Sequence, residues 1–303
     1  MTTKYMIPFI KYRFVLIGIS ALLFAASVVT IAVKGINYGI DFKGGAKLAY
    51  QFNRPVSESE VREAIQGAVE GTPSVVRFGE ESENRMSIKV SLPEEHAKIG
   101  EQVTEALEKK FGPGSAVLEK EETVGPRVGK ELRRKAILAT VFSWLLMMIY
   151  IAYRFEFVYA PGAFISIIHD TVITVGVFAL LQKEVDLTIL AALLTLIGYS
   201  INDTIVVFDR IRENRHRITP TTIWDVVNDA INSTISRTII TSLTIFLIVL
   251  VLFLKGGGTL HDFAFAMIIG VIIGTYSSIF MASPIYIGTY RYWPVVKRLW
   301  SKR

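Results

Sequence analysis

The stretch FVLIGISALLFAASVVTIAV occupies residues 14–33 and contains no charged side chain. An α-helix needs about 20 mostly apolar residues to cross a bilayer, so this segment is long enough to span one. It is longer than the apolar part of a typical signal peptide, and no clear small-residue cleavage site follows it. We therefore expect it to be retained as a membrane helix. The whole chain of 303 residues is 51% hydrophobic and only 20% charged, and its apolar runs exclude an ordinary soluble enzyme.

Five further apolar segments follow the first. They cover residues 136–153, 158–181, 187–208, 238–254 and 263–287. Each is continuously apolar and does not alternate between apolar and polar residues, which excludes a membrane β-barrel. The sequence therefore predicts a polytopic α-helical membrane protein with six transmembrane helices.

The positive charge of the chain is concentrated at its two ends. The formal net charge is +6, from 33 Lys and Arg against 27 Asp and Glu. The two tails hold basic residues and no acidic ones: Lys4, Lys11, Arg13, Arg291, Lys297, Arg298, Lys302 and Arg303. The loop between the fourth and fifth segments adds four arginines, whereas the opposite short loops offer only Lys183 and Lys255. By the positive-inside rule both termini are cytoplasmic, and the basicity reports topology and not nucleic-acid binding.

The segment between the first two predicted helices is polar, and we expect it to form an extracytoplasmic domain. Its signals alternate between strand and helix, with strands near residues 46–52, 74–78, 86–90 and 116–122 and helices near 57–69 and 94–111. Ser57 and Glu60 form a capping-box pattern at the start of the first of these helices. The order βαββαβ is typical of a small α+β ferredoxin-like domain. We divide the chain into 1–34, 35–134, 135–288 and 289–303, the last a basic cytoplasmic tail.

No enzyme signature accompanies this organisation. Cysteine is absent, which excludes disulfides, a thiol nucleophile and a cysteine metal site. The outer domain has no glycine-rich phosphate loop, nucleophile elbow or metal-ligand spacing. We therefore expect a protein without hydrolytic chemistry, cofactor or metal, whose outer domain binds a peptide or a protein partner.

A few charged and polar residues lie inside the predicted helices, where each costs several kcal/mol and needs a reason. His169 and Asp170 fall near the middle of the third helix, and Asn202 and Asp203 near the cytoplasmic end of the fourth. Arg237 begins the fifth, which runs antiparallel to the fourth, so it is expected at a depth similar to that of Asp203. A carboxylate that holds or releases a proton, near an arginine, is the minimal equipment of an intramembrane proton pathway.

Alternative interpretations stay open for these residues. Asp203 and Arg237 would also fit a static ion pair that holds helices together, and His169 and Asp170 a hydrogen-bonded helix contact. Gly270 and Gly274 form a small-residue motif in the sixth helix, which permits close helix packing. The polar loop 209–236 has helical spacing of apolar residues and predicts an amphipathic connector lying at the membrane surface.

Several strings in the chain carry a family resemblance. They are GIDFKGG at 39–45, GPRVGKEL at 125–132, YRFE at 153–156, HD at 169–170, IGYSINDTIVVFDRIREN at 197–214 and SRT at 236–238. Together with the layout of one helix, a polar domain and five helices, they make the chain resemble the SecF family of protein-export membrane proteins over nearly its whole length. This family belongs to the resistance-nodulation-division superfamily.

The resemblance implies a function and a set of partners. It implies a SecF-like subunit that pairs with a SecD-like subunit to give twelve helices in the bacterial cytoplasmic membrane, and that associates with the SecYEG channel and YajC. The pair uses the proton motive force to promote late translocation and release of unfolded preproteins. The family's proton-pathway residues match Asp203 and Arg237, and its motif before the outer domain is carried by Asp41, Gly44 and Gly45, which we interpret as a possible hinge.

Two other functions remain alternatives. The chain would also fit half of a proton-coupled small-solute exporter of the same superfamily, or a scaffold subunit that transports nothing. An exporter needs a substrate pocket and usually a large outer portion on both halves, whereas this outer domain is small and single. A scaffold would tolerate neutralisation of every charge inside the membrane.

Overall fold

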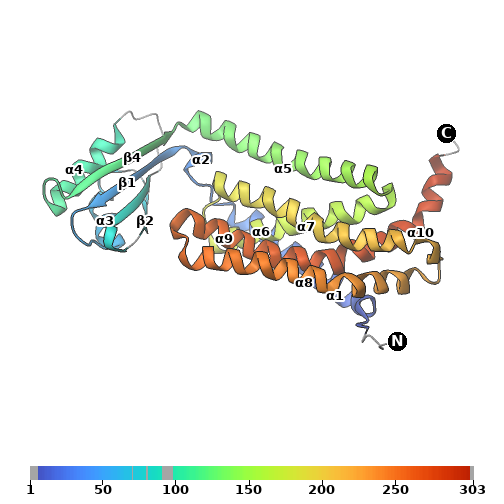
Figure 1. The fold of residues 1–303 in the computed structure, drawn as a ribbon. Coiled ribbons are helices and arrows are strands. Elements are labelled where there is room, and N and C mark those ends of the chain that lie inside the picture. The colour runs from blue at the N-terminus through green and yellow to red at the C-terminus, as the bar shows by residue number, and fades with distance from the viewer. Residues whose placement is uncertain (1–5, 70, 80, 91–97, 301–303) are drawn as a thin grey trace.

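The computed structural model describes residues 6–69, 71–79, 81–90 and 98–300, and it consists of a small sheet domain at one end of a long helix bundle (Figure 1). Six helical segments of the described chain are long and apolar enough to cross a membrane. They are Phe9–Lys34, Pro126–Arg154, Phe157–Leu181, Leu187–Glu213, Ile223–Lys255 and Leu260–Trp293. The predicted number and order of membrane helices are thus confirmed.

The bundle is built from α1 (Arg13–Lys34), α5 (Pro126–Arg154), α6 (Ala160–Leu181), α7 (Leu187–Glu213), α8 (Ile223–Lys255), α9 (Gly257–Ser277) and α10 (Ser283–Trp300). Short helical turns, Phe9–Tyr12, Phe157–Tyr159 and Arg215–Arg217, precede α1, α6 and α8. Helices α6, α7 and α9 pack against one another and are largely buried, whereas α1, α5 and α8 lie at the periphery. Both ends of the described chain lie at the end of the bundle away from the sheet domain (Figure 1).

The fifth membrane helix is longer than predicted. The polar loop 209–236 is not a separate helix on the membrane surface, since α7 continues to Glu213 and α8 already begins at Ile223. The apolar residues with helical spacing, Ile223, Val226, Val227 and Ile231, are buried against the bundle. Arg237 therefore lies well inside α8 and does not begin it.

The sixth membrane segment is continuous but contains an irregular turn. Residues Ser278–Ala282 form a π-helical turn between α9 and α10. Pro284 follows directly, and because proline lacks an N–H it cannot donate to the carbonyl four residues earlier. Just before Pro284, the Ser283 hydroxyl donates to the Ser278 carbonyl at 3.2 Å. The helix thus continues past Pro284 with a local irregularity.

The sheet domain has the predicted order of elements, β1 (Gly45–Phe52), α3 (Glu58–Ile65), β2 (Ser74–Phe78), β3 (Arg85–Val90), α4 (Ile99–Phe111) and β4 (Ala116–Val124), with a short turn at Glu81–Glu83. The strands lie in the order β2-β3-β1-β4 and all neighbours are antiparallel. This is the expected ferredoxin-like arrangement. Helix α3 ends four residues before the predicted position 69, and residues 94–97 of the second predicted helix lie outside the described part of the chain.

One face of the sheet carries the core of this domain. Leu48, Tyr50, Met86 and Ile88 alternate along β1 and β3 and are fully buried beneath α3 and α4. The capping box at the start of α3 is present, since the Glu60 N–H donates to the Ser57 hydroxyl at 3.2 Å and the Ser57 N–H donates to the Glu60 carboxylate at 2.8 Å. The other face of the sheet has no helix on it within the domain and points toward the end of α8 and α9.

Candidate functional site

Buried polar side chains in the bundle gather in two clusters, one on each side of α7. The first is centred on Asp170 of α6 and the second on Asp203 of α7, and both carboxylates are almost fully buried, at 1% and 2% exposed. Each cluster combines hydroxyl groups from neighbouring helices. A buried carboxylate is costly unless it is hydrogen-bonded or protonated, so the partners of each one determine what it can do.

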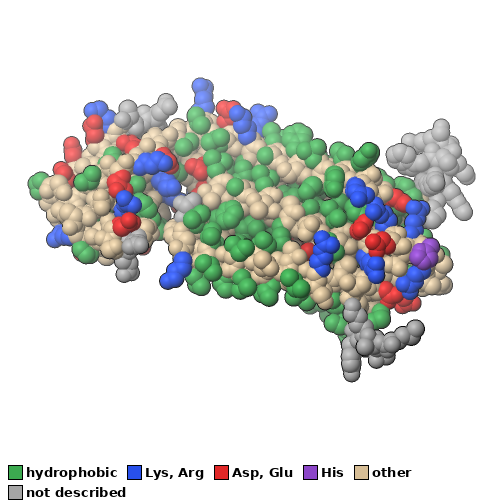
Figure 2. All heavy atoms as spheres, viewed as in Figure 1, with side chains coloured by type: hydrophobic (Ala, Val, Ile, Leu, Met, Phe, Trp, Pro, Cys, Tyr) green, Lys and Arg blue, Asp and Glu red, His purple; other side chains and the backbone are tan. Residues whose placement is uncertain are grey.

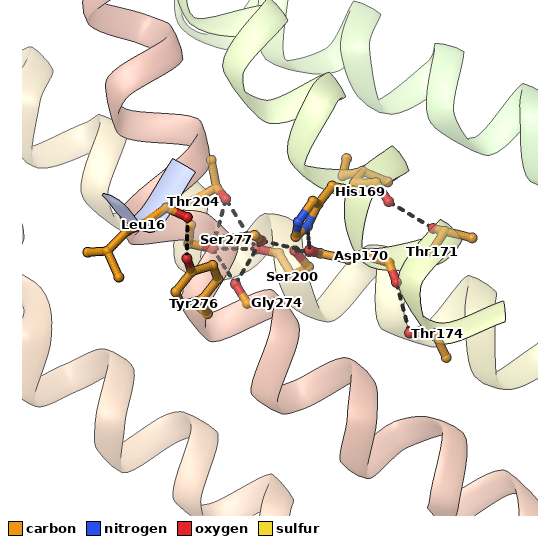
Figure 3. A network of polar contacts seen from close by, with 12 residues as sticks. Leu16, His169, Asp170, Thr171, Thr174, Ser200, Thr204, Gly274, Tyr276 and Ser277 are labelled. Atoms are coloured by element: carbon orange, nitrogen blue, oxygen red, sulfur yellow. Dashed lines mark hydrogen bonds and ion pairs between the residues drawn. The ribbon is translucent and has the colours of Figure 1, made fainter. Parts of the chain in front are cut away.

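Asp170 is held by three hydrogen-bonding groups from three helices (Figure 3). The hydroxyls of Ser200 on α7 and Ser277 on α9 donate to its Oδ2 at 2.6 and 2.8 Å, and His169 Nδ1 lies 3.0 Å from its Oδ1. Gly274 makes this convergence possible, because a Cβ there would lie 3.1 Å from Cβ of Ser200. The small-residue motif thus permits the close approach of α9 to α7 at Asp170.

His169 is the only imidazole in this cluster, and one of its nitrogens has no partner. The ring is 2% exposed and stacks on Phe24 of α1, with centroids 6.3 Å apart and an interplanar angle of 7°. Its Nδ1 faces Asp170, whereas its Nε2 is buried without a hydrogen-bond partner among the described residues. The Nε2 of His169 is therefore open to a further hydrogen bond.

Asp203 has fewer partners than Asp170. Its Oδ2 accepts a hydrogen bond from Ser242 of α8 at 3.3 Å. Ser242 in turn is the centre of a hydroxyl chain, because Tyr199 donates to it at 2.7 Å and Thr275 of α9 lies 2.7 Å from it. Asp203 is thus a buried carboxylate whose only hydrogen-bond partner among the described side chains is a neutral hydroxyl.

Arg237 does not form an ion pair with Asp203 within the part of the chain that the structure describes. Its side chain is exposed and lines a cavity of about 500 Å³ between α5, α7 and α8, together with Asn202 and Asp209. The antiparallel helices do place Arg237 and Asn202 at the same cavity, as the depth argument predicts. The rotation of α7 turns Asp203 inward, away from that cavity and toward Ser242.

The residues that sequence reasoning missed are hydroxyl groups. Ser200, Ser242 and Thr275 complete the two clusters. Hydroxyls inside apolar helices are common, and most of them bond back to their own helix. Thr204, which lies between the two clusters, makes both kinds of contact. Its hydroxyl donates to the Ser200 carbonyl of its own helix at 3.3 Å, and it lies 3.0 Å from the Ser278 hydroxyl of the sixth membrane segment.

The motif at residues 39–45 lies at the junction of the sheet domain and the bundle, where α2 (Ile40–Lys43) leads into β1. Asp41 reaches the start of α7, and its Oδ2 accepts a hydrogen bond from the Leu187 N–H at 3.0 Å. Asp186 caps the same helix end by accepting from Ile189 at 3.1 Å. Burial raises the pKa of Asp186, although the hydrogen bond from Ile189 works against this. The helix that carries Asp203 is therefore fastened at its first turn to the Asp41 motif.

Gly44 and Gly45 are required by close packing and by backbone conformation. Gly44 has φ +88°, and a Cβ there would lie 2.7 Å from Cα of Pro126 at the start of α5. Gly45 has φ +157°, and a Cβ there would lie 2.4 Å from the Val90 carbonyl oxygen. These contacts explain why both residues are glycine, and the hinge interpretation stays a prediction.

A salt bridge also connects the sheet domain with the bundle. Lys89 of β3 and Glu184, in the turn between α6 and α7, are 2.6 Å apart. Burial alone would lower the pKa of Lys89, but the hydrogen bond and the charge of Glu184 outweigh it, so the pKa is raised. Within the described residues, no group of three or more His, Cys, Asp or Glu side chains is placed to hold a metal ion.

Six helices long and apolar enough to cross a membrane, with buried carboxylates on two neighbouring ones and a small sheet domain at one end, define a polytopic membrane protein. Comparison with known proteins identifies the family. The family described as protein export membrane protein SecD/SecF, C-terminal, matches residues 103–291, and the SecD/SecF GG motif matches residues 29–56. This chain therefore belongs to the SecD/SecF family, and its similar relatives are on the SecF side.

Two relatives show how complete the similarity is. The protein translocase subunit SecF of Vibrio alginolyticus is 41% identical over 278 residues, which cover 91% of this chain and 88% of that protein. The protein of the same description from Desulfurispirillum indicum is 39% identical over 310 residues, covering 98% and 97%. The crystal structure of SecDF from Thermus thermophilus, a translocon-associated membrane protein, superposes with a TM-score of 0.80 at 32% identity. It covers all of this chain, which spans 40% of the SecDF chain.

Proposed function

We propose that this protein is one half of a two-part, proton-driven membrane complex that promotes protein translocation, with Asp203 as the proton-binding group. The observation that carries the proposal is the environment of Asp203. It is a carboxylate with one hydroxyl donor to its Oδ2, buried inside a membrane bundle, one residue from an open polar cavity that contains Arg237. Charged groups at such positions are expensive and are retained where they bind ions or protons.

The cavity beside Asp203 supports a route for the proton. Asn202 and Arg237 line the cavity and are exposed, whereas Asp203 faces the hydroxyl chain of Tyr199, Ser242 and Thr275. A rotation of α7 would bring Asp203 to the cavity and to Arg237. Asp170, with two serine donors and His169, is the better satisfied carboxylate, and we assign it and His169 a second, inner position on the proton pathway.

An uncovered polar surface supports the need for a partner subunit. Thr195 and Asn202 on α7 and Arg237 and Thr244 on α8 are exposed, although all four lie on membrane-spanning helices. Polar and charged groups inside a membrane face protein or water and not lipid. We therefore propose that the helices of a SecD-like subunit cover this surface and complete a twelve-helix unit, in keeping with the greater length of the solved SecDF chain.

The orientation and the remaining partners belong to the same proposal. The basic tails and the common position of the two chain ends support an orientation in which both ends are cytoplasmic and the sheet domain lies outside the bacterial cytoplasmic membrane. The coupled partners would be the SecYEG channel, YajC and an unfolded preprotein emerging on the sheet-domain side. No hydrolytic step is part of the proposal, since the proton gradient supplies the free energy. A small-solute exporter and a passive scaffold are outcomes of the test.

The test compares two Asp→Asn substitutions. Asp203→Asn removes the proposed proton site, whereas Asp225→Asn removes an exposed carboxylate in the first turn of α8 that does not line the cavity. Preprotein release and proton conductance are measured in membrane vesicles that carry the partner subunit and either variant. We expect both activities to be lost in Asp203→Asn and retained in Asp225→Asn. Undiminished activity in Asp203→Asn would refute the proton role, and proton-dependent efflux of a small solute would favour the exporter.

A further inference from the structure

A second concave surface lies on the outside of the bundle, away from both carboxylate clusters. It is a groove of about 260 Å³ with α1 and α5 as its walls and α6 and α7 as its floor, and residues that define it are Ile31, Arg133, Thr140, Trp144, Val172 and Leu193. We name it the α1–α5 groove. Its walls are peripheral helices, and the flanking side chains Ile137 and Phe142 are 56% and 58% exposed. The groove therefore opens toward the hydrocarbon of the membrane.

The inside of the groove presents mostly carbon. The hydroxyls of the two threonines in it are already used, because Thr140 donates to the Ala136 carbonyl at 3.0 Å and Thr171 donates to the Ile167 carbonyl at 2.8 Å. Each bond returns to the residue's own helix. The indole N–H of Trp144, at the bottom of the groove, has no hydrogen-bond partner among the described residues. The rest of the lining below the mouth is apolar and suits a hydrocarbon chain.

The dimensions of the groove fit one such chain. Along α5 it extends from Arg133 to Trp144, a rise of about 16 Å. This is close to the depth of one leaflet, since the hydrocarbon core of a bilayer is about 30 Å thick.

The mouth of the groove is positively charged. Arg133 lies there with its guanidinium over the Tyr38 ring, 5.1 Å from the ring centre, and it forms no ion pair with any described residue. Lys130 and Arg134 are exposed beside it, and the acidic Glu131 is paired with Lys135 at 2.8 Å. In Figure 2, basic side chains gather over the first turns of α5 and hydrophobic ones follow along the helix. A half-buried, unpaired guanidinium at this position complements a phosphate group.

We propose that the α1–α5 groove binds one anionic phospholipid from the leaflet on the sheet-domain side, with an acyl chain along α6 and the phosphate at Arg133. The charge at the mouth selects the lipid, because an acyl chain gains little free energy by moving from the other acyl chains of the bilayer into an apolar groove. One basic residue near the phosphate favours binding of an anionic lipid over a neutral one about fivefold. The bound lipid would contact α1, α5 and the segment that leads to the Asp41 motif, so it would stabilise the junction with the sheet domain.

The experiment uses the tryptophan at the bottom of the groove. The chain has four tryptophans, and the other three are replaced by phenylalanine so that only Trp144 remains. The full-length protein, with its partner subunit if the two co-purify, is placed in phosphatidylcholine nanodiscs that contain a small share of lipid with brominated acyl chains. We expect brominated phosphatidylglycerol to quench Trp144 about fivefold more effectively than brominated phosphatidylcholine at the same share.

Two matched variants decide the outcome. Arg133→Gln should remove the preference for phosphatidylglycerol, whereas Arg134→Gln, the same change one residue away and outside the groove, should keep it. Val172→Phe fills the groove without touching the charge, and should bring quenching by both lipids to the same low level even if Arg133→Gln fails to fold. Equal quenching by the two lipids in the parent protein overturns the proposal. Complete protection of Trp144 also overturns it, because protein would then cover the groove.

Discussion

Replacing Asp41 by alanine should loosen the first turn of α7, the helix that carries Asp203. The Asp41 carboxylate accepts the Leu187 N–H at 3.0 Å, and Asp186 satisfies a second free N–H of the same helix end. Loss of a capping acceptor costs about 1 kcal/mol, which corresponds to about a fivefold larger population of the open helix end. Asp41→Asn should have a smaller effect, since its amide oxygen still accepts the hydrogen bond.

Hydrogen exchange followed by mass spectrometry measures this opening. We expect the peptide that contains residues 187–190 to exchange about fivefold faster in Asp41→Ala, with peptides from the middle of α7 unchanged. Lys43→Gln is the matched control, because Lys43 is on the same short helix but its Nζ donates to Asn37 and not to α7. The reasoning is refuted if exchange at 187–190 is the same in Asp41→Ala and the parent, or if Lys43→Gln accelerates it equally.

Three further predictions concern stability. Gly44→Ala should lower the melting temperature by several degrees, because Gly44 has φ +88° and an added Cβ would lie 2.7 Å from Cα of Pro126 in α5. An unchanged melting temperature would contradict this. The bridge between Lys89 and Glu184 should stabilise the protein at neutral pH, and this contribution should be lost as the pH rises through the raised pKa of Lys89. The difference in melting temperature between the parent and Lys89→Gln should therefore vanish at high pH, and a difference that stays constant would count against it. Ser277→Ala removes a donor to buried Asp170 and should cost about 1–3 kcal/mol in unfolding free energy, whereas a cost near zero would mean that Asp170 is protonated or hydrated instead.

Much of the fold follows from the sequence because its signals are local. The six apolar segments and the alternation at Met86, Ile88 and Val90 specify helices and strands without any knowledge of their neighbours. The ends of the helices were less predictable. The first three turns of α8 are polar on one side and apolar on the other. Such an amphipathic pattern fits a separate helix on the membrane surface as well as the first part of a longer helix, and only the packing against the bundle distinguishes the two.

The site was predictable only in its charged members. Asp170 and Asp203 are conspicuous in apolar sequence, but the serines that bind Asp170 come from helices far away along the chain. Which hydroxyl meets which carboxylate depends on the rotation of each helix, and an error of one residue corresponds to 100°. The rotation of α7 about its own axis explains why Arg237 lines a cavity together with Asn202 and does not form a salt bridge with Asp203.

The central claim is that Asp203 changes its protonation state while the protein works. Infrared difference spectroscopy detects this directly through the carbonyl stretching band of a protonated carboxyl group, recorded on the complex in membranes as the pH is changed. The account predicts a band that responds to pH in the parent and in Asp225→Asn and that is absent from Asp203→Asn. A responding band that persists unchanged in Asp203→Asn would contradict it.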